Sequence, residues 1–366
     1  MQGRTTQEEG GRKPAGSKVV LAAFLPAVAW LAGLQSVMAG IGEWTSSGPG
    51  GGTVQALAID PRNTATLYAG GVGSGVFKSA DGGRSWSAVN DGLTNLTILD
   101  LAIDPSTTPS TVYAATGGSG VFRSTDGGES WSQIGPPVPG PNAYVVAVDP
   151  VVPTTLYACI RAWLMKSTDA GMSWTTGSTG AENVSDLAID AANPSTIYAA
   201  GAMATPTGGG LYKTLDGGAT WRKVTWGLFD ASGRDYDVSR VAIDPSSTSI
   251  VYITTAGGVF KSIDGGTSWT SKNNGLQGQT VGDLAIDPVT TATLYVGAWG
   301  GVFKSTDGGD VWAALGQGLA GRSVSDLVVD PQTPTTLYAA TDAGVFSLQQ
   351  VTPPGDGTRH ERTPRR

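Results

Sequence analysis

The strongest constraint on this chain is an internal repeat. The phrase LAIDP and its variants recur seven times, with the aspartate at Asp60, Asp104, Asp149, Asp190, Asp244, Asp287 and Asp330. A segment like LYA follows each copy, and six copies continue through GVFKS or a relative of it to a box that ends in tryptophan. The period is about 43–48 residues, the length of a supersecondary unit that stacks on its neighbours.

Each unit contains four short segments with strand character, typified by VSDLAID, TLYAA, GVFKS and SWSQ. Asp-Pro and Asp-Gly-Gly turns separate them. Abundant glycine (54 residues) and a charged fraction of only 14% suit short strands joined by tight turns. Four strands per unit at this period predict the blade of a β-propeller. The repeats of a parallel β-helix are much shorter, and the glycine and β-branched content excludes a helical solenoid.

The two ends of the repeat region complete each other. There are seven first strands but six boxes, because the last unit stops at GVFSLQQ without its tryptophan strand. The segment EWTSS, residues 43–47, has the character of an unpaired fourth strand. We therefore predict an all-β fold, a single seven-bladed propeller of four-stranded blades over residues 43–350. An N-terminal strand carrying Trp44 completes the last blade and leaves no exposed sheet edge.

The box itself predicts a turn and not a catalytic site. Its acid follows a strand and precedes two glycines, which supply the positive φ of a tight turn, while the carboxylate bonds local amides. The tryptophan covers the hairpin with a large apolar ring. Chemistry seldom needs six copies of one site around a ring. The structural box aspartates are Asp81, Asp126, Asp169, Asp216, Asp264 and Asp307.

These boxes, among them SADGGRSW, STDGGESW and SIDGGTSW, resemble the Asp-box or BNR repeat. That pattern is shared by sialidases, xyloglucanases, sortilin and the photosystem II assembly factor family. The resemblance covers residues 43–350 and implies a propeller whose boxes lie on the face opposite the usual binding site. It implies no single function, since unrelated activities share this fold.

The first 39 residues differ in composition from the repeats. Basic residues precede an apolar run, and SVMAG places Val37 and Ala39 at positions −3 and −1 of a cleavage site. We interpret residues 1–39 as a secretory signal peptide; the alternative is an uncleaved membrane anchor. Either interpretation predicts an extracytoplasmic protein, periplasmic or secreted, in a bacterium. Residues 351–366 are polar and contain proline, so we expect a disordered tail.

Charge and composition exclude several partners. The net charge is −7, whereas nucleic acid binding requires clustered lysine and arginine. The single cysteine, Cys159, has no partner for an internal disulfide. The single histidine lies in the tail, and we expect neither a metal nor a cofactor. One alternative stays open, a structural calcium ion at Asp230, Asp235 and Asp237. We expect a monomer.

Two glycoside hydrolase alternatives are considered. By resemblance, a sialidase needs an arginine triad and a tyrosine nucleophile paired with a glutamate. The four glutamates after residue 39, Glu43, Glu129, Glu182 and Glu361, have no evident tyrosine partner. By resemblance, a xyloglucanase carries one acid in a turn after the second strand, where Asp342 stands, and a second acid in another propeller. A glycosidase of this kind needs two carboxylates, and one is not enough.

A second set of charged residues lies four positions before the LAIDP aspartate. Four units have aspartate there, Asp100, Asp186, Asp283 and Asp326, and the fifth unit has Arg240. If the first strand is innermost, these side chains crowd the entrance of the central channel. One interpretation is ion pairing between blades or capping of turns. The other is a site for a polar ligand or a cation.

Aromatic residues outside the repeat pattern provide a second candidate surface. Trp163 and Trp299 fall between second and third strands, and Trp226 and Tyr236 lie in the long connection between units four and five. Both kinds of connection emerge opposite the boxes, and exposed rings there can stack on sugars or on a protein. We therefore predict a non-enzymatic binding or assembly module for a protein or an extracellular polysaccharide. The alternative is a glycoside hydrolase of the Asp-box type.

Overall fold

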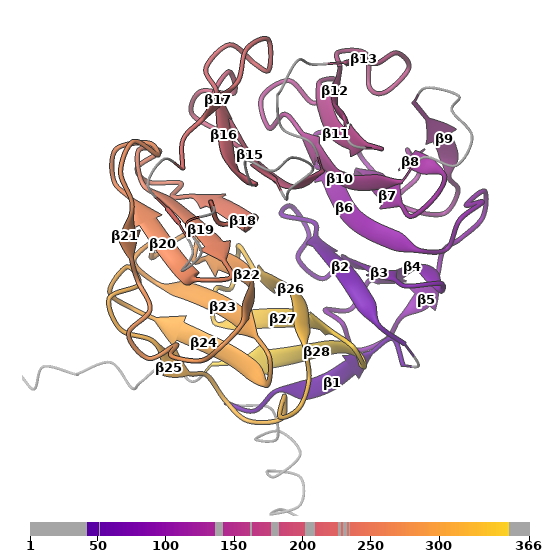
Figure 1. Ribbon diagram of the computed structural model, residues 1–366. Coiled ribbons are helices and arrows are strands. Elements are labelled where there is room, and N and C mark those ends of the chain that lie inside the picture. Colours follow the sequence, from indigo (N-terminus) through magenta and orange to yellow (C-terminus); the bar gives the residue numbers. More distant parts are fainter. Residues whose placement is uncertain are drawn as a thin grey trace, which may run out of the picture. The chain divides into compact units, whose positions relative to one another are not determined.

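Each repeat of the sequence folds into one four-stranded antiparallel sheet, and the seven sheets are arranged as blades around a central axis (Figure 1). The computed structural model describes residues 42–50, 52–135, 142–161, 163–176, 183–201, 209–225, 228, 229, 233 and 235–350. Within these residues the structure consists of strands and turns, and no helix long and apolar enough to cross a membrane is found. The predicted signal peptide and tail lie outside them.

The strands of each blade follow the chain from the channel outward. Blades 1 to 3 comprise β2 (Val54–Ile59), β3 (Leu67–Gly71), β4 (Gly75–Ser79) and β5 (Ser87–Ala88); β6 (Ile98–Asp104), β7 (Thr111–Thr116), β8 (Gly120–Ser124) and β9 (Ser132–Ile134); and β10 (Ala143–Val148), β11 (Leu156–Ile160), β12 (Trp163–Ser167) and β13 (Thr175–Thr176). Blades 4 and 5 comprise β14 (Val184–Ile189), β15 (Ile197–Gly201), β16 (Gly210–Thr214) and β17 (Arg222–Lys223); and β18 (Val238–Ile243), β19 (Val251–Thr255), β20 (Gly258–Ser262) and β21 (Thr270–Ser271).

Blades 6 and 7 complete the ring. They comprise β22 (Val281–Ile286), β23 (Leu294–Ala298), β24 (Gly301–Ser305) and β25 (Ala313–Ala314); and β26 (Val324–Val329), β27 (Thr336–Thr341), β28 (Gly344–Gln349) and β1 (Thr45–Gly48). The outermost strands of blades 1 and 3 to 6 are only two residues long, which limits the open edge of each sheet.

The core lies between the faces of neighbouring blades. The second strand of each blade is covered on both faces, so LYAGG in β3 and IYAAG in β15 are buried at every residue. One core cluster joins Tyr68 and Val76 of blade 1 to Ile98, Phe122 and Trp131 of blade 2. In both strands the tyrosine is followed by three small residues, which allow the faces of neighbouring blades to approach closely.

The N-terminal strand closes the ring, as the sequence predicts. β1 pairs antiparallel with β28, with Thr45 opposite Ser347 and Ser46 opposite Phe346, so the indigo and yellow ends of the chain meet in one blade (Figure 1). Trp44 is buried, and its indole N–H donates to the carbonyl of Leu315 in blade 6 at 2.8 Å. The tryptophans of blades 1, 2, 5 and 6 likewise donate to a carbonyl of the preceding blade.

The box is a closed set of local hydrogen bonds. In blade 2, the Ser124 hydroxyl donates to Asp126 at 2.7 Å and accepts from the Gly128 amide at 2.7 Å. The other carboxylate oxygen of Asp126 accepts from the Ser130 hydroxyl at 2.5 Å. Gly127 and Gly128 have φ of 73° and 97°, so the turn requires glycine. Asp126 thus makes local hydrogen bonds within the turn.

Five of the six boxes also accept a hydrogen bond from a tyrosine of the preceding blade. The Tyr68 hydroxyl of blade 1 donates to the Gly127 carbonyl of blade 2 at 2.8 Å, and the Lys78 ammonium lies over the Tyr68 ring. The same tyrosine-to-glycine bond recurs in Tyr157–Gly217, Tyr198–Gly265, Tyr252–Gly308 and Tyr338–Gly82. The box is thus an element of blade packing, as well as a turn.

Candidate functional site

The channel is lined by the innermost strands, and each of them has a β-bulge at the same position. In blade 2 the pairing shifts between Ile98 and Asp100, and in blade 4 between Val184 and Asp186. A bulge re-aims the side chain and frees backbone groups of the ladder. The residues that resume the pairing directly after each bulge are Ala56, Asp100, Val145, Asp186, Arg240, Asp283 and Asp326. This is the set that the sequence places at the channel.

Three of the aspartates join neighbouring blades through backbone amides. One oxygen of Asp100 accepts from the Leu101 amide of its own strand at 2.9 Å, and the other accepts from Val146 of blade 3 at 2.8 Å. Asp186 and Asp326 repeat this arrangement, with Leu187 and Val241 at 2.9 and 2.7 Å, and with Leu327 and Leu57 at 2.9 and 2.6 Å. Each carboxylate is therefore a bridge between two inner strands.

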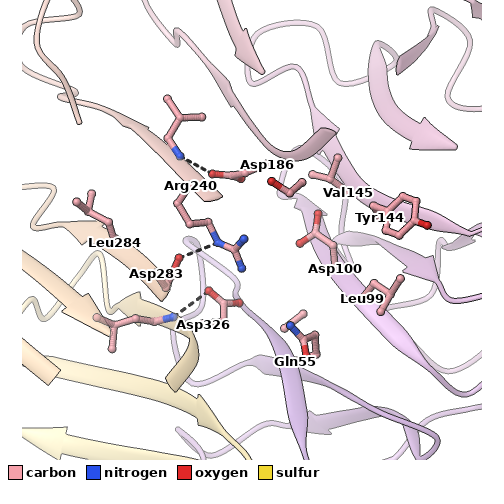
Figure 2. Close-up of a pocket in the computed structure, with 14 residues that line it drawn as sticks. Gln55, Leu99, Asp100, Tyr144, Val145, Asp186, Arg240, Asp283, Leu284 and Asp326 are labelled. Carbon is pink, nitrogen blue, oxygen red and sulfur yellow. Dashed lines mark hydrogen bonds and ion pairs between the residues drawn. The ribbon is translucent and has the colours of Figure 1, made fainter. Parts of the chain in front are cut away.

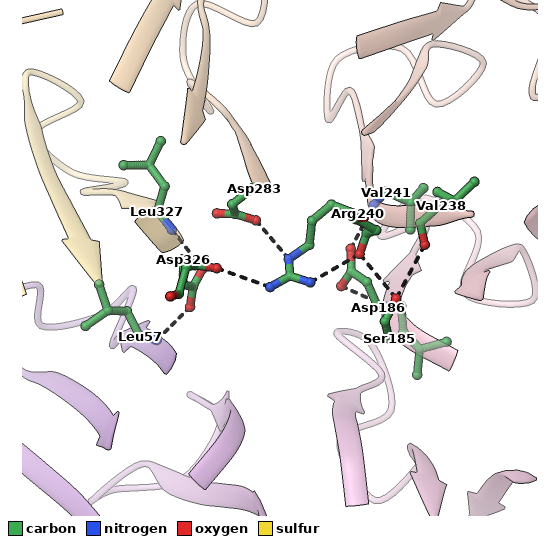
Figure 3. Close-up of polar contacts among 12 residues, drawn as sticks. Leu57, Ser185, Asp186, Val238, Arg240, Val241, Asp283, Asp326 and Leu327 are labelled. Carbon is green, nitrogen blue, oxygen red and sulfur yellow. Dashed lines mark hydrogen bonds and ion pairs between the residues drawn. The ribbon is translucent and has the colours of Figure 1, made fainter. Parts of the chain in front are cut away.

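Arg240 extends across the channel from blade 5 (Figure 3). Its Nε donates to Asp283 of blade 6 at 2.9 Å, and a terminal nitrogen donates to the Ser325 carbonyl of blade 7 at 3.3 Å. The other terminal nitrogen donates to the Ser239 carbonyl at 3.1 Å. One guanidinium thus links three successive blades, and its ion pair with Asp283 is largely buried.

These groups enclose one side of a cavity of about 190 Å³ at the channel (Figure 2). Gln55, Leu99 and Tyr144 of blades 1 to 3 form the other side. Gln55 and Leu99 were not among the channel residues predicted from the sequence. Both are the unpaired residues of their bulges, five positions before the LAIDP aspartate, and that offset is the signal that would have found them.

Burial changes the acidity of the channel groups. Removal from water raises the pKa of Asp100 to about 7, and the nearby charge of Asp186 adds to this effect. Burial also raises the pKa of Asp186 and that of Asp326, although Arg240 opposes the shift in both. Four carboxylates face one guanidinium here, so the cluster has more acid than its cation can neutralise.

The predicted aromatic residues differ in exposure. Trp163 begins β12 and Trp299 follows β23, and their side chains are 55% and 62% exposed. Tyr144, at the channel, is 38% exposed. Tyr236 is partly buried and its ring lies 5.9 Å from that of Phe260, inside blade 5. Trp226 lies outside the described residues.

The topology assigns the exposed rings to one face. Strands alternate in direction, so turns between second and third strands and links between blades share one face, here called the link face. Boxes and the turns after first strands share the other, the box face. Within the described residues, the exposed aromatic side chains Tyr144, Trp163, Phe229 and Trp299 are all on the link face, whereas the exposed box-face apolar residues are aliphatic.

The candidate hydrolytic acids are separated in the structure. Asp342 lies in the turn between β27 and β28, and its nearest cation is Arg322 at 3.8 Å. Glu129, in a box, pairs with Lys78 at 3.3 Å, and Glu43 is exposed at the closing strand. Glu182 and Glu361 lie outside the described residues. Among the residues that the structure describes, Asp342, Glu129 and Glu43 do not line the channel cavity.

Two acids of the long connection between blades 4 and 5 make local polar contacts. Asp235 pairs with Lys223 at 2.5 Å, and Asp237 accepts from the Gly209 amide at 3.1 Å. Asp230 lies outside the described residues. Among the residues that the structure describes, no group of three acidic, histidine or cysteine side chains is arranged to hold a metal ion.

Comparisons with known proteins agree with this architecture. Residues 122–133 match the BNR/Asp-box repeat family. The structure is similar to the GH74 xyloglucanase from Xanthomonas campestris, with a TM-score of 0.68 and 21% identity over 85% of this chain and 54% of that chain. It is also similar to YCF48 from Cyanidioschyzon merolae, with a TM-score of 0.60 and 15% identity over 83% of this chain and 98% of that one.

A third similar structure is the extracellular domain of a putative hybrid two component system from B. thetaiotaomicron, with a TM-score of 0.67 and 15% identity over 85% of this chain and 40% of that chain. The chain spans about half the length of the GH74 enzymes that it matches. None of the curated proteins compared with it matches. The fold and the repeated boxes define a seven-bladed Asp-box β-propeller, a class that includes enzymes and other proteins.

Proposed function

We propose that this propeller is an exported, non-enzymatic binding or assembly module that holds a protein or an extracellular polysaccharide on its link face. The observation that carries the proposal is the segregation of exposed rings. Trp163 and Trp299 stand on blades 3 and 6, well separated around the ring, and Tyr144 lines the cavity on the same face. Exposed aromatic side chains offer large rigid contact area for sugars or protein segments.

The hydrogen bonds and the ion pair of the channel aspartates also favour a binding function over hydrolysis. Asp100, Asp186 and Asp326 each accept two backbone amides, and Asp283 pairs with Arg240. A general acid or nucleophile has to reach a substrate oxygen or carbon, and these carboxylates are committed to the inner strands. Among similar structures, YCF48 has been solved bound to a D1 peptide, which supports protein binding as a use of this fold.

The test compares two pairs of surface substitutions on arrays of immobilised glycans and peptides. We expect the wild-type protein to bind at least one probe, and W163A/W299A to bind it at least tenfold more weakly. The matched control is M172A/I263A, which removes exposed side chains from the box face and should leave binding unchanged. Equal loss in both double variants, or none in W163A/W299A, would contradict the proposal.

The hydrolase alternative has a separate readout. The protein is incubated with xyloglucan and a panel of other glycans, and released reducing ends are measured. Turnover that D342N or D326N abolishes would identify an enzyme and overturn the proposal. Absence of turnover together with link-face binding is the expected result.

A further inference from the structure

The channel cluster has more carboxylates than cations, and its members differ in how closely they approach Arg240. Asp283 makes the ion pair, and Asp186 and Asp326 are the next strongest charges acting on the guanidinium. Asp100, across the cavity on blade 2, has the weakest of these four interactions. Of the four carboxylates, Asp100 is therefore the one whose charge Arg240 compensates least.

The groups that face Asp100 come from every element around the cavity. Asp186 on β14, Asp283 on β22 and Asp326 on β26 are acidic, and Arg240 on β18 is the cation. From β10 the titratable group is the Tyr144 phenol, and β2 contributes the neutral Gln55. When all four carboxylates are ionised, this small space contains a net charge of about −3, and repulsion between like charges is strong where water is scarce.

The same carboxylates bridge the blades. Asp100 connects blade 2 to blade 3 through Val146, Asp186 connects blade 4 to blade 5 through Val241, and Asp326 connects blade 7 to blade 1 through Leu57. A change in the charge of one acid therefore acts on contacts between inner strands and on the shape of the channel mouth.

We propose that Asp100, Asp186, Asp283, Asp326 and Arg240 form a proton-responsive clasp at the centre of the ring. Asp100 takes a proton from solvent under mildly acidic conditions and returns it as the pH rises. Loss of that proton adds a negative charge beside Asp186 and Asp326, and the repulsion destabilises the inner ring, although the Val146 amide binds the carboxylate more strongly than the neutral acid. The inner ring is therefore more stable at mildly acidic pH than at neutral pH. This inference does not depend on the proposed binding function.

The sign of the pH effect follows from the direction of the shifts. The pKa of Asp100 is raised to about 7 in the folded state, so the folded protein holds a proton that the unfolded chain has lost above about pH 4. Stability is greatest below the unfolded value and falls as the pH rises toward 7. One such proton makes the unfolding equilibrium constant increase about tenfold per pH unit in this window.

The experiment measures the unfolding equilibrium constant by urea denaturation between pH 5 and pH 8. We expect the wild-type constant to rise with pH, and the slope of D100N to be shallower by about tenfold per pH unit. The matched control is D126N, the same substitution in the same blade, which should retain the wild-type slope. Parallel profiles for the wild type and D100N, or a flat wild-type profile, would overturn the proposal.

A second measurement needs no variant and covers the case in which D100N does not fold. Calorimetric unfolding at pH 6 in buffers of different ionisation enthalpy counts the protons exchanged. We expect the wild-type protein to release about one proton or more on unfolding. Release of none, or uptake, would refute the clasp.

Discussion

The box aspartates and the channel aspartates use the same chemistry in opposite surroundings. Asp126 at the box face accepts two hydroxyls and an amide in contact with solvent, and these bonds lower its pKa to about 2. Asp100 in the channel accepts two amides within the cavity, and burial raises its pKa to about 7. The sequence motif alone does not decide acidity; access to water does.

The contrast gives the fold two pH limits with different causes. Box carboxylates contribute stability above about pH 4, and that contribution is lost as the pH falls toward 2. Channel carboxylates weaken the fold as the pH rises from about 4 toward 7. We therefore expect the greatest stability between these two windows, in mildly acidic solution.

Removing the channel cation should have the largest effect. R240M leaves Asp283 without its ion pair and removes the charge that opposes the raised pKa of Asp186 and Asp326. Breaking a buried ion pair from one side typically costs roughly 3 kcal/mol or more of unfolding free energy. Urea denaturation should show a greater loss of unfolding free energy at pH 8 than at pH 5, because at pH 5 the unpaired carboxylates can take up protons. An equal loss at both pH values would mean that Arg240 acts through packing alone.

Substitution of a box acid should have a smaller effect with the opposite pH dependence. D126N removes the charge that the Ser124 and Ser130 hydroxyls and the Ser130 amide stabilise. We expect the melting temperature at pH 7 to fall by about 2 °C. Because the pKa of Asp126 is lowered to about 2, the difference from wild type should shrink as the pH falls from 4 to 2. A difference that grows on acidification would refute this account of the box.

A substitution in the sixth box should produce the smallest of these changes in stability. In the other five boxes a serine or threonine hydroxyl donates to the second carboxylate oxygen, but box six has Val311 at that position. V311S supplies the missing donor on an exposed site, so Asp307 should ionise at lower pH and the melting temperature should rise by about 1 °C. Carboxyl NMR titration measures the shift directly, and D307N in the same background is the control. An unchanged Asp307 titration would contradict the role assigned to the hydroxyl.

The sequence predicted the ring well because its signals are periodic and local. Trp44 and the orphan strand could be assigned to blade 7 by counting, since closure requires every blade to have four strands. The channel aspartates were found by their fixed offset from the LAIDP acid. The partners of these channel residues could not be predicted from the sequence. The register between inner strands of neighbouring blades determines that Asp100 meets Val146 and that Arg240 reaches Ser325.

The exposure of the aromatic residues depends on contacts that their positions in the sequence do not specify. Trp163 and Tyr236 both stand outside the repeat pattern, yet one is exposed and the other packs against Phe260. Tyr236 is covered because its ring lies beside Gly257, where a side chain would leave no room for it. Packing of this kind depends on three-dimensional neighbours, which a single sequence does not specify.

The pairing of β1 with β28 sets the order in which the molecule can be assembled. Thr45 and Ser347, which meet in that pair, are 302 residues apart in the chain. A nascent chain has made the first partner long before the second exists, so Trp44 has no complete pocket until the final hairpin emerges. A nascent chain that ends before Gly344 lacks β28, so its ring is open and β27 has an unpaired edge. We expect a short peptide with the β28 sequence to bind this edge in trans.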